Sequence, residues 1–413
     1  MRTGNPRAAD RRLAGITRVT VADVKRVANT VLSPQRRLEL RYAKGDGDPK
    51  GWANPTPLPR FQATPAVTGT PNQLRPEGER EAPPAAGTPA AFAMPAIADS
   101  KLANGLRVVT ARTTAVPLGT LTVAIKAGSA IEPRAKAGLA GLVADIASKG
   151  TTTRSADDIA AGFERLGASL SSAASPDGTF LTVTAPTATL EQAAALLSDV
   201  IQNAAYPEED FARERKRALD GLSVALKDPG QLAGRLVAPV AFGGAPYGVV
   251  AGGTPASLAS LTRADLLDFR QRWWRPDLAT AFVSGGVDPA EARGMVERAF
   301  GQWRAVGAAP VLPTNLAGAA LPARTLVVDL PGSGQAAVYA FARGISRADP
   351  AYYDAVLANS ILGGSSTGRL FQEIRVKRAL SYGAFSNLAG NLAGGTLVAQ
   401  AQTKNESAAD VAK

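Results

Sequence analysis

Two hydrogen-bond donors, Arg375 and Tyr382, stand seven residues apart in the run from Ile361 to Ser386, which reads ILGGSSTGRLFQEIRVKRALSYGAFS. A guanidinium is a permanently charged fork of donors, and a phenol hydroxyl is a short directional donor. The two could therefore converge on one oxygen that develops negative charge during a reaction. Residue type alone favours a plainer interpretation, an ordinary surface arginine and a half-buried tyrosine.

The same run predicts the elements that would position this pair. A Gly-rich break at 363–368 precedes a short helix with Leu370, Phe371 and Ile374 on one side, and a strand-like segment follows at 380–385. The break lacks the terminal Gly-Lys-Ser/Thr order of a phosphate-binding loop. We therefore interpret it as a turn that enters the helix.

Composition excludes several functional classes. The chain has 413 residues, enough for two or three domains, and 45% of them are hydrophobic, so wholesale disorder is excluded. Lysine and arginine number 46 against 35 acidic residues, giving a net charge of +11, but the basic residues are scattered rather than clustered. Nucleic-acid binding is therefore not predicted.

The chain contains neither cysteine nor histidine. A Ser-His-Asp triad, a Cys-His pair and an imidazole-bound zinc therefore cannot be built from it. A stand-alone hydrolase that uses serine or paired carboxylates also has little support, because no G-x-S-x-G elbow can find a histidine partner. No apolar run approaches the ~18 residues of a membrane span, and the N-terminal residues MRTGNPRAADRRLAG lack a signal-peptide core.

A helix–turn–strand unit occurs twice. Residues 16–42 predict a helix capped by Thr20, a stop at Pro34 and a strand at 38–42. At a constant offset of 242 residues, Thr20, Asp23 and Pro34 recur as Thr262, Asp265 and Pro276. Because internal repeats reveal duplicated architecture, we assign residues 1–45 as the C-terminal tail of a preceding domain that resembles the domain at 99–308.

The remaining chain divides into a linker and two domains. Residues 46–98, rich in Pro, Ala and Gly, predict a semi-extended linker. In the domain at 99–308 we expect strands at 106–110, 118–127, 168–172 and 180–185, and helices at 134–148, 155–166, 189–203 and 207–226. The domain at 322–413 repeats this order with strands at 325–329, 336–342 and 395–401 and a helix at 350–362, and we expect it to be truncated. The predicted class is α+β, in duplicated two-layer domains with helices on mainly antiparallel sheets.

The pattern L-G-G-x-x-x-x-R-L-F-Q-E-I-R-x-K-R-x-L-S-Y, which ends at Tyr382, resembles a signature in the C-terminal half of the insulinase/pitrilysin family of zinc metallopeptidases. The resemblance implies a metallopeptidase or processing-peptidase-like fold whose halves close around a peptide. It also implies that Arg375 and Tyr382 bind the substrate beside a zinc site on the facing domain. Gly332 to Gln335 resembles the family's loop before a substrate-facing strand, so Gln335 is expected near the peptide.

Catalytic members of this family carry an inverted H-x-x-E-H on a helix and a further glutamate ligand on a later helix. In this sequence Gly141 and Asp145 occupy the histidine positions, Ala144 occupies the position of the base, and Gly221 falls close to the later glutamate. A single aspartate cannot replace several converging donors, and Asp145 is expected to be a solvated helix residue. The chain is therefore predicted to hold no zinc and to be inactive alone.

The resemblance implies a non-catalytic, substrate-binding half that assists peptide proteolysis by a zinc-bearing half. That partner would lie upstream in the same polypeptide or in a second chain of a heterodimer, and the zinc would belong to it. A catalytically dead structural or assembly subunit of the same fold is the alternative. The resemblance implies a periplasmic or envelope setting, on which the residues themselves are silent.

Overall fold

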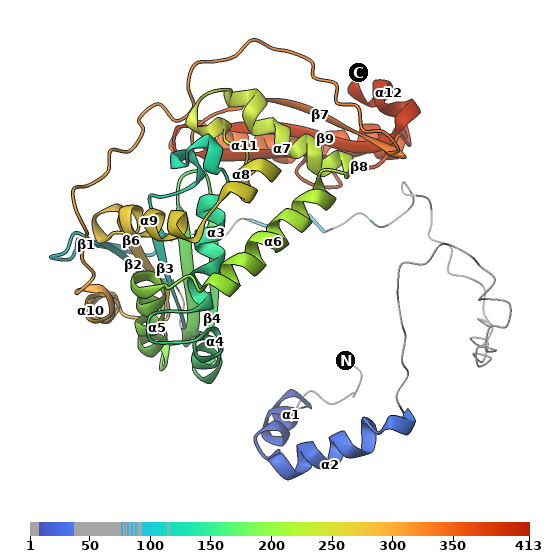
Figure 1. Cartoon of the computed structure of the whole chain (residues 1–413). Coiled ribbons are helices and arrows are strands. Elements are labelled where there is room, and N and C mark those ends of the chain that lie inside the picture. Colours follow the sequence, from blue (N-terminus) through green and yellow to red (C-terminus); the bar gives the residue numbers. More distant parts are fainter. Residues whose placement is uncertain are drawn as a thin grey trace. The chain divides into compact units, whose positions relative to one another are not determined.

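The computed structural model describes residues 8–36, 93–113 and 116–413, together with scattered residues between 76 and 88. The chain divides into two compact units, Met1–Pro89 and Ala90–Lys413, and Figure 1 traces their elements. The strand predicted at 38–42 and most of the predicted linker at 46–98 lie outside the described residues.

The described residues of the first unit form α1 (Ala8–Ile16), α2 (Val21–Val31) and a 3-10 turn at Pro34–Arg36. A capping box begins α2: the Thr20 hydroxyl accepts a hydrogen bond from the backbone N–H of Asp23, whose carboxylate accepts one from the Thr20 N–H. The predicted helix is confirmed, and it ends before Pro34 because proline lacks the N–H that would continue it.

The second unit contains the same helix and turn again. Here α9 (Arg263–Trp273) begins with a capping box between Thr262 and Asp265, and a 3-10 turn follows at Pro276–Leu278. The offset of 242 residues carries both bounds of α2, and both bounds of its turn, onto α9 and its turn. The repeat found in the sequence is therefore a repeat of local structure.

A six-stranded sheet organises the first region of the second unit. Its order is β1-β2-β6-β3-β5-β4, and only the β2–β6 pair is parallel. The strands are β1 (Ile97–Lys101), β2 (Arg107–Arg112), β3 (Leu118–Ile125), β4 (Ser169–Ala174), β5 (Thr179–Pro186) and β6 (Ala279–Gly285). The mainly antiparallel sheet and the β4–β5 hairpin are confirmed. Strand β1 begins inside the segment predicted as linker, because Ile97 already pairs with Ala111.

Helices build a core against one face of this sheet. They are α3 (Leu139–Ile146), α4 (Ala156–Arg165), α5 (Leu190–Asn203), α6 (Glu208–Ala225), α8 (Pro255–Ser260), α9 and α10 (Pro289–Phe300). Helix α7 (Pro229–Phe242) follows α6 and contributes no residue to this core. Alternate residues of β3, among them Leu121, Val123 and Ile125, point into that core, as a strand covered on one face requires. Trp273 and Trp274 pack in the same core.

The helix predicted at 134–148 is interrupted. Arg134–Lys136 forms a 3-10 turn, and α3 begins only at Leu139, because Gly138 takes a left-handed conformation with φ of 96°. The buried Glu132 carboxylate accepts hydrogen bonds from the N–H groups of Gly138 and Ala140. It thereby caps α3 in place of a local side chain.

The second region repeats part of this arrangement around a three-stranded sheet of order β7-β9-β8. Its elements are β7 (Gln335–Gly344), α11 (Tyr352–Gly363), a π-helix η9 (Phe371–Lys377), β8 (Ser381–Asn391), β9 (Gly394–Lys404), a 3-10 turn (Asn405–Ser407) and α12 (Ala408–Ala412). The antiparallel order β7-β9-β8 matches β3-β5-β4 of the larger sheet. The prediction of a strand at 325–329 is wrong: the segment has no regular secondary structure, and Val327 is 86% exposed.

Helix α7 joins the two regions by packing along β7 (Figure 1). Tyr339 donates a hydrogen bond from its hydroxyl to the carbonyl of Gly230, 3.0 Å away. Arg343 donates to the carbonyl of Ala241 at 3.1 Å and stacks over the ring of Phe242. The β7 sheet is therefore fixed against the first region by polar contacts as well as by packing.

Candidate peptide-binding site

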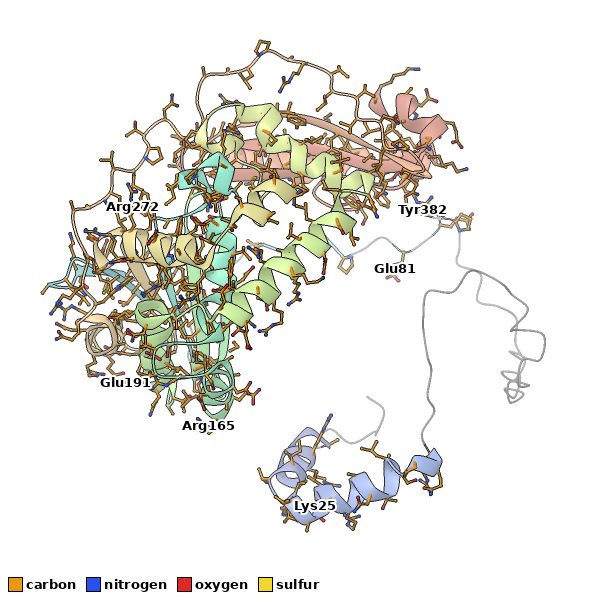
Figure 2. All side chains as sticks on the ribbon, in the orientation of Figure 1. Lys25, Glu81, Arg165, Glu191, Arg272 and Tyr382 are labelled. Carbon is orange, nitrogen blue, oxygen red and sulfur yellow. The ribbon has the colours of Figure 1, made fainter. Side chains whose placement is uncertain are left out.

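The structure brings Arg375 and Tyr382 together. The Arg375 guanidinium carbon lies 5.3 Å from the centroid of the Tyr382 ring, within the range of a cation–π interaction. Figure 2 labels Tyr382, which belongs to β8 of the three-stranded sheet, and this residue is 86% exposed. Glu373, the acidic residue of the same π-helix, pairs with Lys377 at 3.0 Å rather than with Arg375. Both donors are thus presented to solvent side by side.

A π-helix and a β-bulge set the direction of the two side chains. In η9 the N–H of Arg378 bonds to the carbonyl of Glu373, five residues back, and π-turns of this kind recur at functional sites. The β8–β9 register shifts between Ser381 and Ala384. Such a bulge turns a side chain out of the regular ladder, which accounts for the exposure of Tyr382.

Ser381 holds this bulge; it stands next to Tyr382 in the quoted pattern, but its residue type does not indicate that role. Its hydroxyl donates a hydrogen bond to the carbonyl oxygen of Gln402 at 2.6 Å and accepts one from the N–H of Gly383 at 3.1 Å. The Gly-rich segment before η9 is a turn, as predicted. A Cβ at Gly363 would lie 2.6 Å from the backbone nitrogen of Ser386, so this position accepts only glycine for steric reasons.

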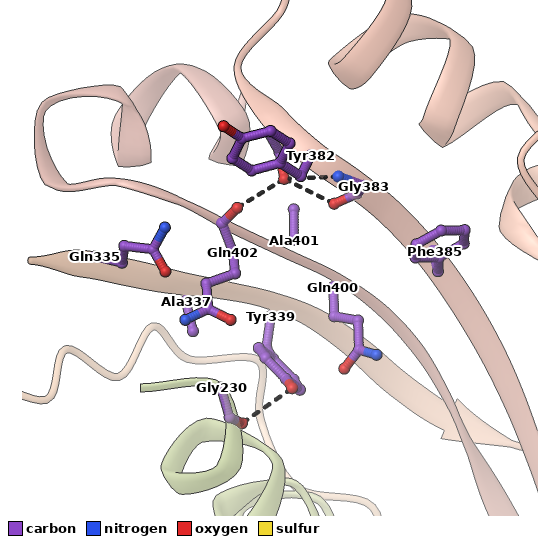
Figure 3. Close-up of a pocket in the computed structure, with 11 residues that line it drawn as sticks. Gly230, Gln335, Ala337, Tyr339, Tyr382, Gly383, Phe385, Gln400, Ala401 and Gln402 are labelled. Carbon is purple, nitrogen blue, oxygen red and sulfur yellow. Dashed lines mark hydrogen bonds between the residues drawn. The ribbon is translucent and has the colours of Figure 1, made fainter. Parts of the chain in front are cut away.

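A pocket of about 390 Å³ opens on the sheet beside Tyr382 (Figure 3). Gln335, which the sequence placed near a peptide, lines the same pocket. The remaining lining residues, which sequence reasoning missed, are uncharged: Gly230, Ala337, Tyr339, Ser381, Gly383, Phe385, Gln400, Ala401 and Gln402. Side-chain amides and aromatic rings can bind peptide groups by hydrogen bonding and packing without selecting a charge.

The alternation of β7 and β9 explains which residues meet in this pocket. Ala337 pairs with Gln402 and Tyr339 with Gln400 across the two strands, so these side chains share one face of the sheet. Burial raises the pKa of Tyr339, and the Asp228 carboxylate raises it further. Tyr339 is therefore a neutral phenol that donates to Gly230.

The positions that match the family's zinc ligands lie on α3 and α6, two helices in contact. A Cβ built at Gly141 or at Gly221 would meet no atom within 4 Å. Ala144 is fully buried, and its carbonyl accepts a hydrogen bond from Ser172 of β4 at 2.9 Å. Asp145 is exposed, as expected for a solvated helix residue. The frame of the motif is present with small side chains at three of its four positions.

Charged side chains surround Asp145. Partial desolvation raises the pKa of the Asp145 carboxyl, as does the nearby Glu214 carboxylate, while Arg217 and Lys149 oppose the rise. Glu214 in turn lies 3.7 Å from Arg217 and 3.9 Å from Arg213. The carboxylates at this place are therefore balanced by cations on neighbouring residues.

These residues do not fit zinc. The metal takes several N, S or carboxylate donors at about 2 Å in a tetrahedral arrangement, and among 8–36, 93–113 and 116–413 no group of three or more His, Cys, Asp or Glu side chains could hold a metal ion. No helix in the described part of the chain is long and apolar enough to cross a membrane.

Two regions of duplicated α+β architecture, one with small side chains at the positions of a metal motif and one with an exposed Arg–Tyr pair, indicate a peptidase-like protein. Family models support this: "Insulinase (Peptidase family M16)" matches residues 107–248, and "Peptidase M16 inactive domain" matches residues 260–413. The chain belongs to the insulinase family, peptidase family M16. The resemblance found in the sequence is confirmed.

Relatives and solved structures agree with this membership. The chain is 30% identical over 287 residues to the uncharacterized zinc protease ML0855 of Mycobacterium leprae, covering 70% of this chain and 64% of the relative. It is 25% identical to the zinc protease YmxG of Bacillus subtilis, covering 68% of each. The chain thus spans less than two thirds of the length of its first mycobacterial relative.

Among solved structures, a peptidase M16 inactive domain from Pseudomonas fluorescens matches with a TM-score of 0.65 and 25% identity over 75% of each chain. A protease from Helicobacter pylori matches in fold, with a TM-score of 0.69 over 76% of each chain. The predicted α+β fold class is confirmed.

Proposed function

We propose that this chain is the non-catalytic, substrate-binding half of an insulinase-family zinc metalloendopeptidase. It assists peptide proteolysis by a zinc-bearing half, located upstream in the same polypeptide or in a partner chain. The observation that carries the proposal is the pairing of Arg375 with Tyr382 at 5.3 Å, exposed to solvent beside a pocket. The match of residues 260–413 to an inactive peptidase domain supports it.

In this function the chain contributes donors and a binding surface. The Arg375 guanidinium and the Tyr382 hydroxyl bind the peptide and stabilise the oxyanion that forms when its carbonyl is attacked. Gln335 and the other uncharged residues of the pocket contact the peptide next to this pair. Water activation belongs to the partner, because the residues on α3 and α6 of this chain do not fit a metal.

A structural or assembly subunit of the same fold is the second candidate. The observation in its favour is the charged cluster of Asp145, Glu214 and Arg217, which stands where a peptidase would hold its metal. The two functions differ in what they require of Arg375 and Tyr382: a scaffold needs neither side chain.

The test mixes the full chain with a homologous half that carries H-x-x-E-H and measures cleavage of a quenched fluorescent peptide. Cleavage should rise on mixing, and Arg375→Ala or Tyr382→Phe should lower kcat/KM by about 10²-fold, the usual effect of losing one oxyanion donor. Lys377→Ala is the matched control, since Lys377 is a cation of the same π-helix already paired with Glu373. No rise on mixing, or a rise indifferent to both substitutions, would assign the scaffold function instead.

A further inference from the structure

Helix α7 begins with a carboxylate at one end of the pocket beside Tyr382. Asp228 is the N-cap of α7, and its Oδ1 accepts a hydrogen bond from the N–H of Gln231 at 2.7 Å. Among the described residues, no side chain forms an ion pair with Asp228, and its Oδ2 accepts no hydrogen bond. One oxygen therefore caps the helix, and the second oxygen remains able to bind another partner.

The space next to Gly230 lies between this carboxylate and the sheet. A Cβ built on Gly230, which lines the pocket, would lie 3.3 Å from Oδ1 of Asp228 and 3.6 Å from the side-chain oxygen of Gln402. In Figure 3 the side chains of Gln402 and Tyr339 point from the sheet toward the helix that carries this glycine. A hydrogen-bond donor placed there would meet two oxygens, whereas a second carboxylate would be repelled.

The other surroundings of the pocket suit a cation. No lining residue is charged, and the lining includes three aromatic rings, whose faces attract cations within about 6 Å: Tyr339, Tyr382 and Phe385. Burial raises the pKa of Tyr339, and the Asp228 carboxylate raises it further, so the charge of Asp228 acts inside the pocket. The α7 end of the pocket is therefore negative, while Arg375 makes the Tyr382 end positive.

We propose that Asp228 is a specificity-determining residue, and that the pocket binds a lysine or arginine side chain of the peptide close to the carbonyl held by Arg375 and Tyr382. The inference rests on the proposed function, because that function supplies the peptide. The substrate cation bonds to the second oxygen of Asp228 and to the side-chain oxygen of Gln402, and its aliphatic part packs on the rings. The lining amides and rings select no charge by themselves, so the selection comes from Asp228.

The plainer function of Asp228 is to cap α7, and asparagine separates the two functions. The side-chain oxygen of Asp228→Asn can still accept the Gln231 N–H, but the side chain carries no charge. Asp288→Asn is the matched control. Asp288 caps α10 by accepting a hydrogen bond from the N–H of Ala290 at 2.9 Å, and α10 contributes no residue to the pocket.

Selectivity for a single side chain tests the proposal in the full chain mixed with the zinc-bearing half. Two series of quenched fluorescent peptides carry either lysine or its uncharged analogue norleucine at one of the three positions on each side of the cleaved bond. At one position lysine should raise kcat/KM about 10-fold over norleucine, the effect of one hydrogen bond between charged groups. Asp228→Asn should remove this preference without changing cleavage of the norleucine peptides, and Asp288→Asn should keep it. No lysine preference at any position, or a preference that survives in Asp228→Asn, would overturn the proposal.

A second pair of variants fills the proposed place of the cation. Gly230→Ala puts a methyl group beside Asp228 and Gln402. Gly234→Ala is the matched control, because its methyl group lies one turn further along α7, 3.6 Å from the Tyr339 hydroxyl. The lysine preference should fall in Gly230→Ala and persist in Gly234→Ala, and equal preferences in the two variants would contradict the place assigned to the cation.

The outcomes separate this inference from the proposed function. Cleavage that depends on Arg375 but shows no lysine preference would refute this inference alone. A lysine preference lost in Asp228→Asn, together with cleavage indifferent to Arg375→Ala and Tyr382→Phe, would refute the proposed role of that pair and leave Asp228 as the selecting residue. Equilibrium binding of the same peptides to this chain without the zinc-bearing half should show the same preference, so this measurement decides the inference even if mixing gives no cleavage.

Discussion

Replacing Ser381 by alanine should loosen the bulge that presents Tyr382. The hydroxyl is a donor to the Gln402 carbonyl at 2.6 Å and an acceptor for the Gly383 N–H at 3.1 Å, in a residue that is 8% exposed. Removing one partner of a buried hydrogen bond costs about 1–3 kcal/mol. A loss of about 2 kcal/mol in the free energy of local opening corresponds to about 30-fold faster amide exchange.

Hydrogen exchange at the Gly383 amide measures this loss directly. Ser386→Ala is the matched control, because Ser386 is a second buried serine of the same strand, at 7% exposure, and its hydroxyl makes only one long bond of 3.4 Å to Asn359. Exchange at Gly383 should accelerate in Ser381→Ala and remain nearly unchanged in Ser386→Ala.

Peptide cleavage by this chain mixed with the zinc-bearing half should fall for Ser381→Ala and remain nearly unchanged for Ser386→Ala. If Ser381 only stabilised the strand, destabilisation would spread along β8 and both serine variants would lower cleavage in proportion to their stability. Equal exchange at Gly383 in the two variants, or full cleavage by Ser381→Ala with its bulge opened, would refute the assignment of Ser381 as the positioning residue for Tyr382.

Three further outcomes follow from the structure. Burial raises the pKa of Glu132 to about 7 from 4.5 against the opposing hydrogen bonds from Ala140 and Gly138; the protonated carboxyl therefore favours folding below about pH 4.5 and this contribution is lost as pH rises through about 7. The free energy of unfolding should therefore fall by at most about 3 kcal/mol over this pH range. Urea denaturation should show a smaller fall for Glu132→Gln, and an unchanged dependence of the unfolding free energy on pH would contradict this prediction. Tyr247→Phe removes the hydroxyl that donates to Asp177 and accepts from the N–H of Ala393 at 3.1 Å, and should speed amide exchange at Ala393 by about 10-fold while exchange in β3 stays the same. The purified chain should retain far less than one zinc per molecule after dialysis, measured by elemental analysis, because α3 and α6 offer no fitting ligand set; stoichiometric zinc would contradict this.

Local patterns predicted those elements whose stability is set by neighbours in sequence. Capping boxes at Thr20 and Thr262 and the prolines that follow each helix are short-range features, so the repeat could be found from residue types and spacing alone. The β4–β5 hairpin was equally accessible, because Pro176 to Gly178 form a turn signal between two alternating segments.

The sequence concealed those features that depend on distant contacts. Helix α7 contains Pro239, which argues against a helix, yet Pro229 occupies its first position and Asp228 caps it. Packing along β7 then stabilises a helix that local propensity disfavours. The segment 325–329 shows the opposite case: its apolar residues predict a strand, but no strand forms, because a strand needs a neighbour to pair with.

The candidate site divides along the same line. Arg375, Tyr382 and Gln335 were predicted because they fall in a recognisable motif or loop. The bulge at Ser381 and the pocket residues Tyr339 and Gln402 come together only through strand pairing between β7, β8 and β9. A register shift has no signature in residue types alone, so the motif contains Ser381 without indicating that this serine holds the bulge.

Core packing holds neither Gly141 and Gly221 of the degenerate metal frame nor Tyr382 of the candidate site in place. Gly141 and Gly221 face open space, so the lack of larger side chains at these positions leaves no cavity in the core. The same physical argument applies to Tyr382, whose side chain contributes little to stability because 86% of it remains in water. Stability therefore explains neither the absence of the ligands nor the presence of the Arg375–Tyr382 pair. A pure scaffold would need no such exposed pair, whereas the proposed peptide binding would use both the pair and the pocket beside it.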